Sequence, residues 1–194
     1  MLKINFTFLM MWCSIMHAQD TLQILFSYGS KPNTKAESKW FGGIHGGHVS
    51  ISYKGGYASF VPAGGFHIFS HNKNKKSVFA REEANNFIFD TANSRYLILY
   101  IPVDKRQSNK VDSIISQRIV EAPYDYAFFG MRCASAAYEV LSGAGIYPKY
   151  SLRKMSIKYF YPKLLRKEIY KEVRAHSWKY FYRAGRKSRK WESD

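Results

Sequence analysis

The chain has 194 residues, and its 30 Lys and Arg against 14 Asp and Glu give a formal net charge of +16. The length suits one domain, and a hydrophobic share of 46% can supply a sizeable core. Neither an internal repeat nor a low-complexity linker is present, which excludes a repeat array. Residues 149–194 hold 15 Lys and Arg against 4 acidic residues, a net charge of +11. Such a tail suits a polyanion or an anionic membrane surface, and its plain alternative is a solvated basic helix face.

The first 18 residues read as a secretory signal peptide. Lys3 precedes an apolar run over residues 4–16, and Ala18 offers a small residue for cleavage. No other stretch approaches membrane-spanning length. We therefore expect a secreted or periplasmic protein. Cleavage would remove Cys13 and leave Cys133 as the one thiol, and a lone thiol in an exported protein is either reactive or intermolecular.

The first half of the chain predicts short strands joined by turns. Alternation of apolar and small polar residues over 48–53, then the turn Lys54-Gly55-Gly56, indicates a hairpin. The expected elements are a buried strand over 22–28, a polar loop over 29–39, strands over 49–53, 57–61 and 66–70, a charged loop over 71–76, and a short helix or irregular link over 82–89.

The second half of the chain predicts one central strand and three helices. The run YLILYIPV over 96–103 is typical of a strand inside a sheet. Periodicity then predicts a helix over 108–120 with Ser108 as its N-cap, a helix from Cys133 that Gly143 and Gly145 end, a loop over 147–156, and a helix from Pro162 with the apolar stripe Leu164, Leu165, Ile169, Val173, Trp178 and Phe181. The end, 185–194, is expected to be frayed.

Cys133 is the candidate nucleophile. Gly130 breaks the chain before it, and Ala137, Val140 and Leu141 follow it at helical spacing. The thiol is therefore expected in the first turn of a helix, where free N–H groups and the helix dipole favour thiolate. The alternative is a buried core cysteine that reacts with nothing.

Histidine is the usual base for a thiol nucleophile. His48 begins a predicted strand and shares a face with Ser50 and Ser52, small residues that would let a helix bring Cys133 within reach. A third group should orient its ring from a neighbouring strand; His67 is the first choice and Ser59 the second.

The other histidines are weaker candidates. His45 lies on a glycine-rich loop that could not hold it firmly, and His71 lies in a charged loop. The rival hypothesis is a metal site formed by His45 and His48 and completed by His67. The two glycines between His45 and His48 rule out the firm helix that would hold this pair in place. We expect neither a metal nor another cofactor.

The segment PYDYAFFGMRCASAAYEVLSGAGIYP over 123–148 resembles the catalytic segment of NlpC-type papain-like cysteine peptidases and amidases. The shared features are an aromatic approach, Gly130-x-x-Cys133 at a helix start, and an exit through Gly145, Ile146 and Pro148. The histidine strand GGHVSI precedes the cysteine, an order similar to the circularly permuted branch, which includes lecithin–retinol acyltransferase-like proteins. The chain departs from the pattern at Arg132, where Asp or Asn is frequent, and offers no obvious Asn, Gln or acid as the third catalytic residue.

The resemblance covers about residues 22–148 and implies an α+β fold: a papain-like, permuted NlpC-type domain with an antiparallel sheet packed on a central helix. We expect that domain over 19–155 and a basic helical extension over 156–194. The implied function is a secreted hydrolase that cleaves an amide bond, with cell-wall peptide as one candidate substrate. Cys133 attacks the carbonyl and His48 moves the proton. An acyltransferase or lipid hydrolase would use the same residues.

A hypothesis from another class is an inactive binding module whose basic helix binds an anionic polymer or a membrane surface. Interleaved aromatic and basic residues would also fit nucleic acid, but the export signal argues against such a partner.

Overall fold

The computed structural model describes residues 20–29, 47–63, 67–70, 77–82 and 95–185. The predictions made for the signal peptide, for the loops over 30–39 and 71–76, and for 186–194 lie outside the described residues. The same holds for His45, for His71 and for the expected short helix or link beyond residue 82. Among the described helices, none has the length and apolar composition needed to cross a membrane.

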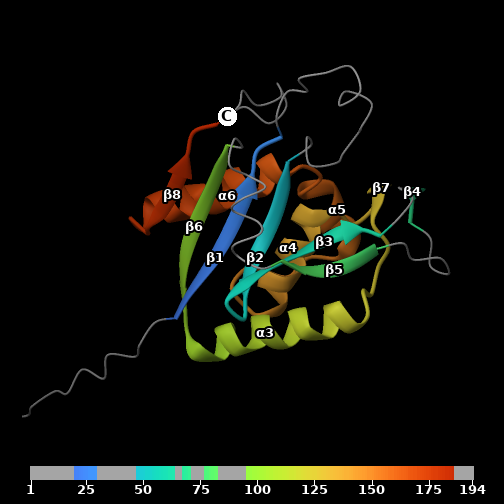
Figure 1. Ribbon diagram of the computed structural model, residues 1–194, viewed down its shortest axis with the longest axis horizontal. Coiled ribbons are helices and arrows are strands. Elements are labelled where there is room, and N and C mark those ends of the chain that lie inside the picture. The colour runs from blue at the N-terminus through green and yellow to red at the C-terminus, as the bar shows by residue number, and fades with distance from the viewer. Residues whose placement is uncertain (1–19, 30–46, 64–66, 71–76, 83–94, 186–194) are drawn as a thin grey trace, which may run out of the picture.

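Six strands form one antiparallel sheet in the order β5-β3-β2-β1-β6-β8 (Figure 1). Their bounds are β1 Asp20–Ser27, β2 His48–Tyr53, β3 Gly56–Pro62, β5 Ser77–Glu82, β6 Tyr96–Val103 and β8 Tyr180–Arg183. A separate parallel pair joins β4 (His67–Phe69) to β7 (Ala127–Phe129). The predicted hairpin of β2 and β3 and the predicted central strand β6 are confirmed.

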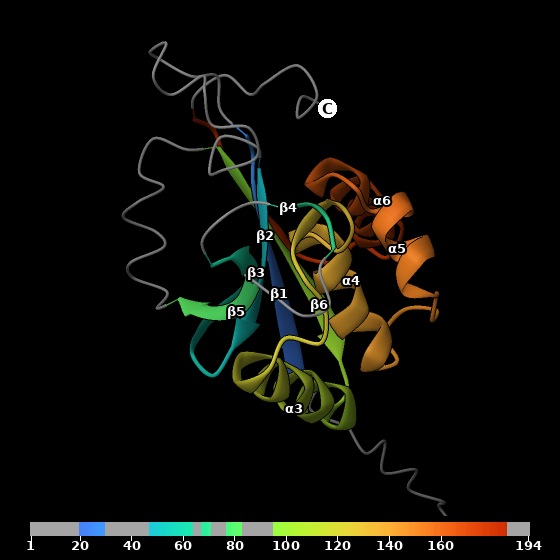
Figure 2. The ribbon, with the colours of Figure 1, turned by 90° about the vertical axis from the view of Figure 1, so that its right-hand side faces the viewer.

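Helices α4, α5 and α6 lie on one side of this sheet, and α3 runs across its lower end (Figure 2). Their bounds are α3 Lys105–Val120, α4 Cys133–Gly143, α5 Leu152–Lys158 and α6 Pro162–Ala175. One core cluster joins apolar residues of all four helices to the facing side of the sheet. Since α4 is buried over most of its length between the sheet and the other helices, the α+β class with an antiparallel sheet packed on a central helix is confirmed.

The pleat of β2 decides which of its residues meet α4. Val49 and Ile51 belong to the core cluster on the helix side, and side chains alternate between faces along a strand. Ser50 pairs with Leu25, which belongs to a second, small cluster on the opposite face. The expectation that a helix packs over Ser50 and Ser52 is therefore wrong: α4 covers the apolar face, where burial gains more free energy.

Several local predictions are corrected by capping or pairing. Helix α3 begins at Lys105, because Asp104 accepts from the backbone N–H of Gln107 and replaces the predicted cap Ser108. The predicted loop over 147–156 contains the start of α5, which Ser151 caps by accepting from the backbone N–H of Lys154. Strands β5 and β7 were not predicted, because neither shows a sustained alternation.

The C-terminal region becomes part of the same core and sheet. Leu165, Ile169 and Val173 are fully buried as predicted, whereas Leu164 is 43% exposed. The helix predicted to continue to Phe181 ends at Ala175 instead, and β8 then pairs with β6. Pairing covers the edge of a long apolar strand, which an extended helix would have left open.

Candidate active site around Cys133

The start of α4 is held by a local hydrogen-bond exchange. Arg132 has extended backbone, its N–H donates to Ser135 Oγ at 2.8 Å, and Ser135 Oγ donates to the carbonyl oxygen of Arg132 at 3.0 Å. Cys133 is thereby fixed as the first residue of the helix, as predicted from the sequence. Its sulfur lies where a helix presents free N–H groups.

The far end of α4 is equally well defined. Gly145 has φ +80°, and its N–H donates to the carbonyl oxygen of Ser142 at 3.1 Å. The N–H of Ile146 donates to the carbonyl oxygen of Leu141 at 3.0 Å. These two bonds form a Schellman motif, which ends a helix through a residue in the left-handed conformation. The prediction that glycine stops this helix is confirmed.

Burial dominates the acidity of Cys133. The residue is 3% exposed, and loss of solvent raises the pKa of its thiol. The charge of Arg132 opposes this rise in pKa, as do hydrogen bonds from the backbone N–H of Val49, the Tyr126 side chain and the backbone N–H of Ala134. The helix start does favour thiolate as expected, but burial outweighs it. The resting form at neutral pH is the thiol.

Arg132, next to Cys133, is a buried cation in an aromatic cage. It is 6% exposed, and its guanidinium carbon lies 4.6 Å from the ring centroid of Phe160, 5.5 Å from that of Phe128 and 5.6 Å from that of Tyr161. Within the described part of the chain, Nε and Nη1 have no hydrogen-bond partner. A buried cation with unused donors is costly unless an anion approaches it.

The space around the sulfur is small. Among the described residues, Val49, Ser59, Phe60 and Cys133 help to line a cavity of about 10 Å³, which is at the limit for one water molecule. Tyr126 is buried close to both Cys133 and Arg132. A substrate carbonyl reaches the sulfur only if this packing opens.

His48 lies beside the sulfur's donor in the chain. It is the first residue of β2, and the next residue, Val49, donates its N–H to Cys133. The pleat assigns the His48 side chain to the face that also carries Ser27, its cross-strand partner. Its Nε2 is buried. Adjacency to Val49 therefore brings the backbone of His48 near Cys133 in space, while the pleat turns its side chain toward the opposite face.

His67 occupies a different place from the one expected. A residue that orients His48 should lie on a strand next to β2, but the neighbours of β2 are β1 and β3, and His67 lies on β4. Ser59, the second choice, does lie on β3 and is buried. His67 Nδ1 instead forms a close hydrogen bond and ion pair with Asp125.

Asp125 is the site residue that the sequence reasoning missed. It is 2% exposed, and Ser77 Oγ donates to its second oxygen at 3.3 Å. The next residue in the chain, Tyr126, contacts Cys133 and acts to lower the pKa of its thiol. The available signal was an acid inside the aromatic run PYDYAFF, since a carboxylate buried there needs partners.

No three His, Cys, Asp or Glu side chains within the described ranges gather in a way that could hold a metal ion. The rival metal hypothesis involves His45, which lies outside these ranges. Comparison of the chain with protein-family models, with curated proteins and with solved structures found no match.

Proposed function

We propose that this chain is a cysteine hydrolase that cleaves an amide bond, with Cys133 as the nucleophile. One observation carries the proposal: the sulfur lies at the start of α4 beside the Arg132 cation, where the backbone N–H groups of Val49 and Ala134 and the Tyr126 side chain act to lower the pKa of the thiol. The same donors that oppose the rise in the thiol pKa would hold negative charge that develops on sulfur or on a carbonyl oxygen.

The reaction would proceed through an acyl-enzyme. A base removes the thiol proton, the sulfur forms a bond to the carbonyl carbon, and the amine leaves with that proton. Water then cleaves the thioester and restores the thiol. Replacement of water by another nucleophile gives the acyltransferase alternative, and an ester-linked lipid substrate gives the lipid hydrolase alternative.

Two imidazoles are candidates for the base. His48 is supported only by its backbone position next to Val49, whose N–H bonds the sulfur, because the pleat turns its side chain toward the opposite face. His67 is supported by Asp125, because a buried carboxylate at Nδ1 holds an imidazole in one tautomer and presents Nε2 as the acceptor. If His48 is the base, Asp125 and His67 support the fold around the site. If His67 is the base, His67 and Asp125 act together with Cys133 in the reaction.

The experiment is trapping of the acyl-enzyme. The full chain is incubated with a p-nitrophenyl ester and with a peptide anilide, and intact mass is followed over time. We expect a thioester on Cys133 that Cys133→Ala cannot form. Loss of acylation in His48→Ala or in His67→Ala identifies the base. Ester turnover that Cys133→Ala retains, or the absence of any adduct, would overturn the proposal.

A second candidate function is a binding module for an anionic polymer or surface. It is favoured by the buried resting thiol and by the absence of a substrate-sized cavity beside it among the described residues. On this view Cys133→Ala leaves binding to a polyanion such as heparin unchanged. Cell-wall peptide remains the first substrate class to test for the hydrolase, as insoluble peptidoglycan and as soluble fragments.

A further inference from the structure

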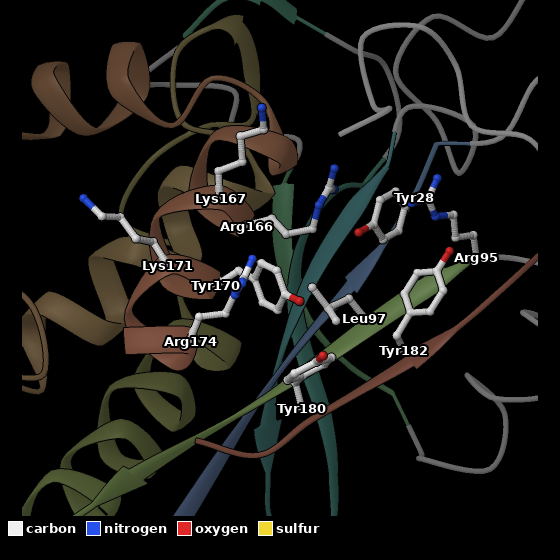
Figure 3. A pocket seen from close by; sticks show the side chains of 10 residues that line it. All are labelled: Tyr28, Arg95, Leu97, Arg166, Lys167, Tyr170, Lys171, Arg174, Tyr180 and Tyr182. Atoms are coloured by element: carbon white, nitrogen blue, oxygen red, sulfur yellow. The ribbon is translucent and has the colours of Figure 1, made fainter. Parts of the chain in front are cut away.

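A second site lies between α6 and the end of the sheet formed by β1, β6 and β8 (Figure 3). It is a cavity of about 690 Å³, within the ~300–1,000 Å³ typical of small-molecule sites. Ten described residues line it, and they share two chemistries, cationic and aromatic, apart from one leucine: Tyr28, Arg95, Leu97, Arg166, Lys167, Tyr170, Lys171, Arg174, Tyr180 and Tyr182.

The sequence brings these residues together through two periodicities. Arg166, Tyr170 and Arg174 recur every four residues on α6 and therefore share one face. Tyr180 and Tyr182 recur every two residues on β8, and they pair with Leu99 and Leu97 on the helix side of the sheet. The cavity exists only because the chain turns from α6 into β8.

Two arginines converge on one ring in the inner part of the cavity. The guanidinium carbon of Arg166 lies 3.8 Å from the ring centroid of Tyr28, and that of Arg95 lies 4.2 Å from the same centroid. Figure 3 shows the two side chains flanking Tyr28. Arg166 is 1% exposed. Two like charges that flank one ring raise the local positive potential, and an anion bound beside the edge of that ring would be attracted to both guanidinium groups.

The residues at the rim of the cavity are also positively charged. Lys167, Lys171 and Arg174 are exposed on α6, and no acidic residue of the described chain lines the cavity. The acids of this helix point elsewhere: Glu168 bonds Lys158 and Tyr159, and Glu172 lies near His176. A field of one sign focused into a concave site favours a ligand with more than one negative charge.

The aromatic residues add a second requirement. The rings of Tyr170 and Tyr180 meet edge to face at 5.3 Å between centroids, and the Arg95 guanidinium lies 5.4 Å from the centroid of the Tyr182 ring. Tyrosine rings at the wall of a cavity offer faces to a sugar or a flat ring. Arginine forks bind phosphate oxygens in pairs.

We propose that this cavity binds a phosphate ester attached to a ring, with the phosphate held by Arg95 and Arg166 and the ring packed among the tyrosines. The site does not depend on Cys133, so it stands whether or not the hydrolase proposal holds. A soluble compound and a lipid headgroup can both supply this phosphate ester, because the chemistry of recognition is the same.

Calorimetric titration of the full chain with ADP, pyrophosphate and adenosine tests the proposal. We expect ADP to bind more tightly than pyrophosphate, and adenosine least. Arg95→Gln and Arg166→Gln should each weaken ADP binding by about tenfold or more, since each removes charge-assisted hydrogen bonds. Cys133→Ala should leave ADP binding unchanged.

A double substitution at the rim of the cavity tests the site without changing the buried Arg166. Lys171→Gln with Arg174→Gln should weaken ADP binding, while the matched pair Arg106→Gln with Lys110→Gln on α3 removes the same charge from exposed positions outside the cavity lining. Thermal melting of each variant checks that it is folded. Equal losses in the two pairs would mean that only total charge matters, and the site would be overturned.

Vesicles distinguish the two sources of the phosphate ester. Co-sedimentation with vesicles of phosphatidylinositol in phosphatidylcholine, compared with phosphatidylcholine alone, reports a lipid headgroup. Retention that Arg95→Gln abolishes and the α3 pair leaves intact assigns the site to a lipid, even if ADP binds weakly. Failure of the wild-type chain to bind ADP, pyrophosphate or the anionic vesicles contradicts the proposal.

Discussion

At the scale of single residues, the site is a balance between burial and hydrogen bonding. Cys133 has the position of an activated thiol, but removal from solvent raises the pKa of the thiol more than Arg132 and the three donors lower it. A helix terminus contributes about 2 kcal/mol at most, so position in a helix cannot by itself overcome complete desolvation. The pKa of the Cys133 thiol falls only when the site opens to solvent or when a bound substrate places a dipole beside the sulfur.

The first prediction concerns alkylation of Cys133. Thiols react as thiolates, so a raised pKa leaves less reactive anion at neutral pH. In the unliganded protein, iodoacetamide should modify Cys133 more slowly than a free cysteine at pH 7, and the rate should still be rising above pH 9. Arg132→Met removes a charge that lowers this pKa and should move the profile to still higher pH. A profile with its midpoint below 8 would contradict the expected direction.

The second prediction concerns the carboxylate that the sequence reasoning missed. Asp125→Ala removes the partner of His67 and an acceptor of Ser77 in a buried setting, which typically costs about 1–3 kcal/mol. Urea unfolding should show this loss of free energy. The control is Asp112→Ala, a half-buried carboxylate on α3, which should change stability by less than about 0.5 kcal/mol.

A double variant then isolates the pair. If the Asp125–His67 contact carries the effect, Asp125→Ala together with His67→Ala should cost clearly less than the sum of the two single variants. Additive costs would show that the two residues act separately.

At the scale of elements, α4 is defined from both ends by chain-local signals. The exchange between Arg132 and Ser135 fixes its start, and the Schellman motif at Gly145 fixes its end. The packing of the helix is not local: Ile114 of α3 lies against Gly143, where an added Cβ would be 2.9 Å from its Cδ1. The start and end of α4 are therefore set by its own sequence, and its position in the fold is set by the elements packed against it.

The third prediction tests the helix end. Gly145→Ala forces a residue with a side chain into the left-handed region and should destabilise the protein by about 1–2 kcal/mol. No atom lies within 4 Å of the added Cβ, so the cost is conformational. Gly145→Asn should cost less, because asparagine tolerates this conformation. Equal losses for the two variants in urea unfolding would point to a different cause.

At the scale of the whole molecule, 30 Lys and Arg against 14 Asp and Glu leave a net charge of +16, so more than half of the basic residues have no acidic counterpart in number. Half of the Lys and Arg residues lie in 149–194, and the chain returns this basic region to the sheet through α6 and β8. Like charges around the α6 cavity repel one another, and this repulsion opposes the compact state. Apolar burial of Leu165, Ile169 and Val173 offsets it.

The fourth prediction follows from that charge. Retention of the full chain on heparin should fall steeply as NaCl rises from about 0.05 to 0.5 M, because the Debye length shortens over this range. The melting temperature should rise over the same interval as self-repulsion is screened. The paired change Lys171→Gln and Arg174→Gln should elute earlier than wild type. Retention indifferent to salt would count against an anionic partner.

The sequence alone determined the features whose physics is local. The hairpin of β2 and β3 follows from alternation around a glycine turn, β6 from an unbroken apolar run, and the bounds of α4 from Cys133 and Gly145. The apolar positions 165, 169 and 173 predicted a buried stripe, and they are buried. In each case a few neighbouring residues supply both the conformation and its energetic reason.

Tertiary structure decided what depends on which elements meet. After Ala175 the chain forms β8, which pairs with the edge of β6 that would otherwise be open. Helix α4 packs on Val49 and Ile51, away from the face of Ser50. Tertiary structure also gave His67 a partner in Asp125, 58 residues away. The pKa of Cys133 was decided in the same way, because desolvation depends on everything that surrounds a sulfur atom and no stretch of sequence contains those surroundings.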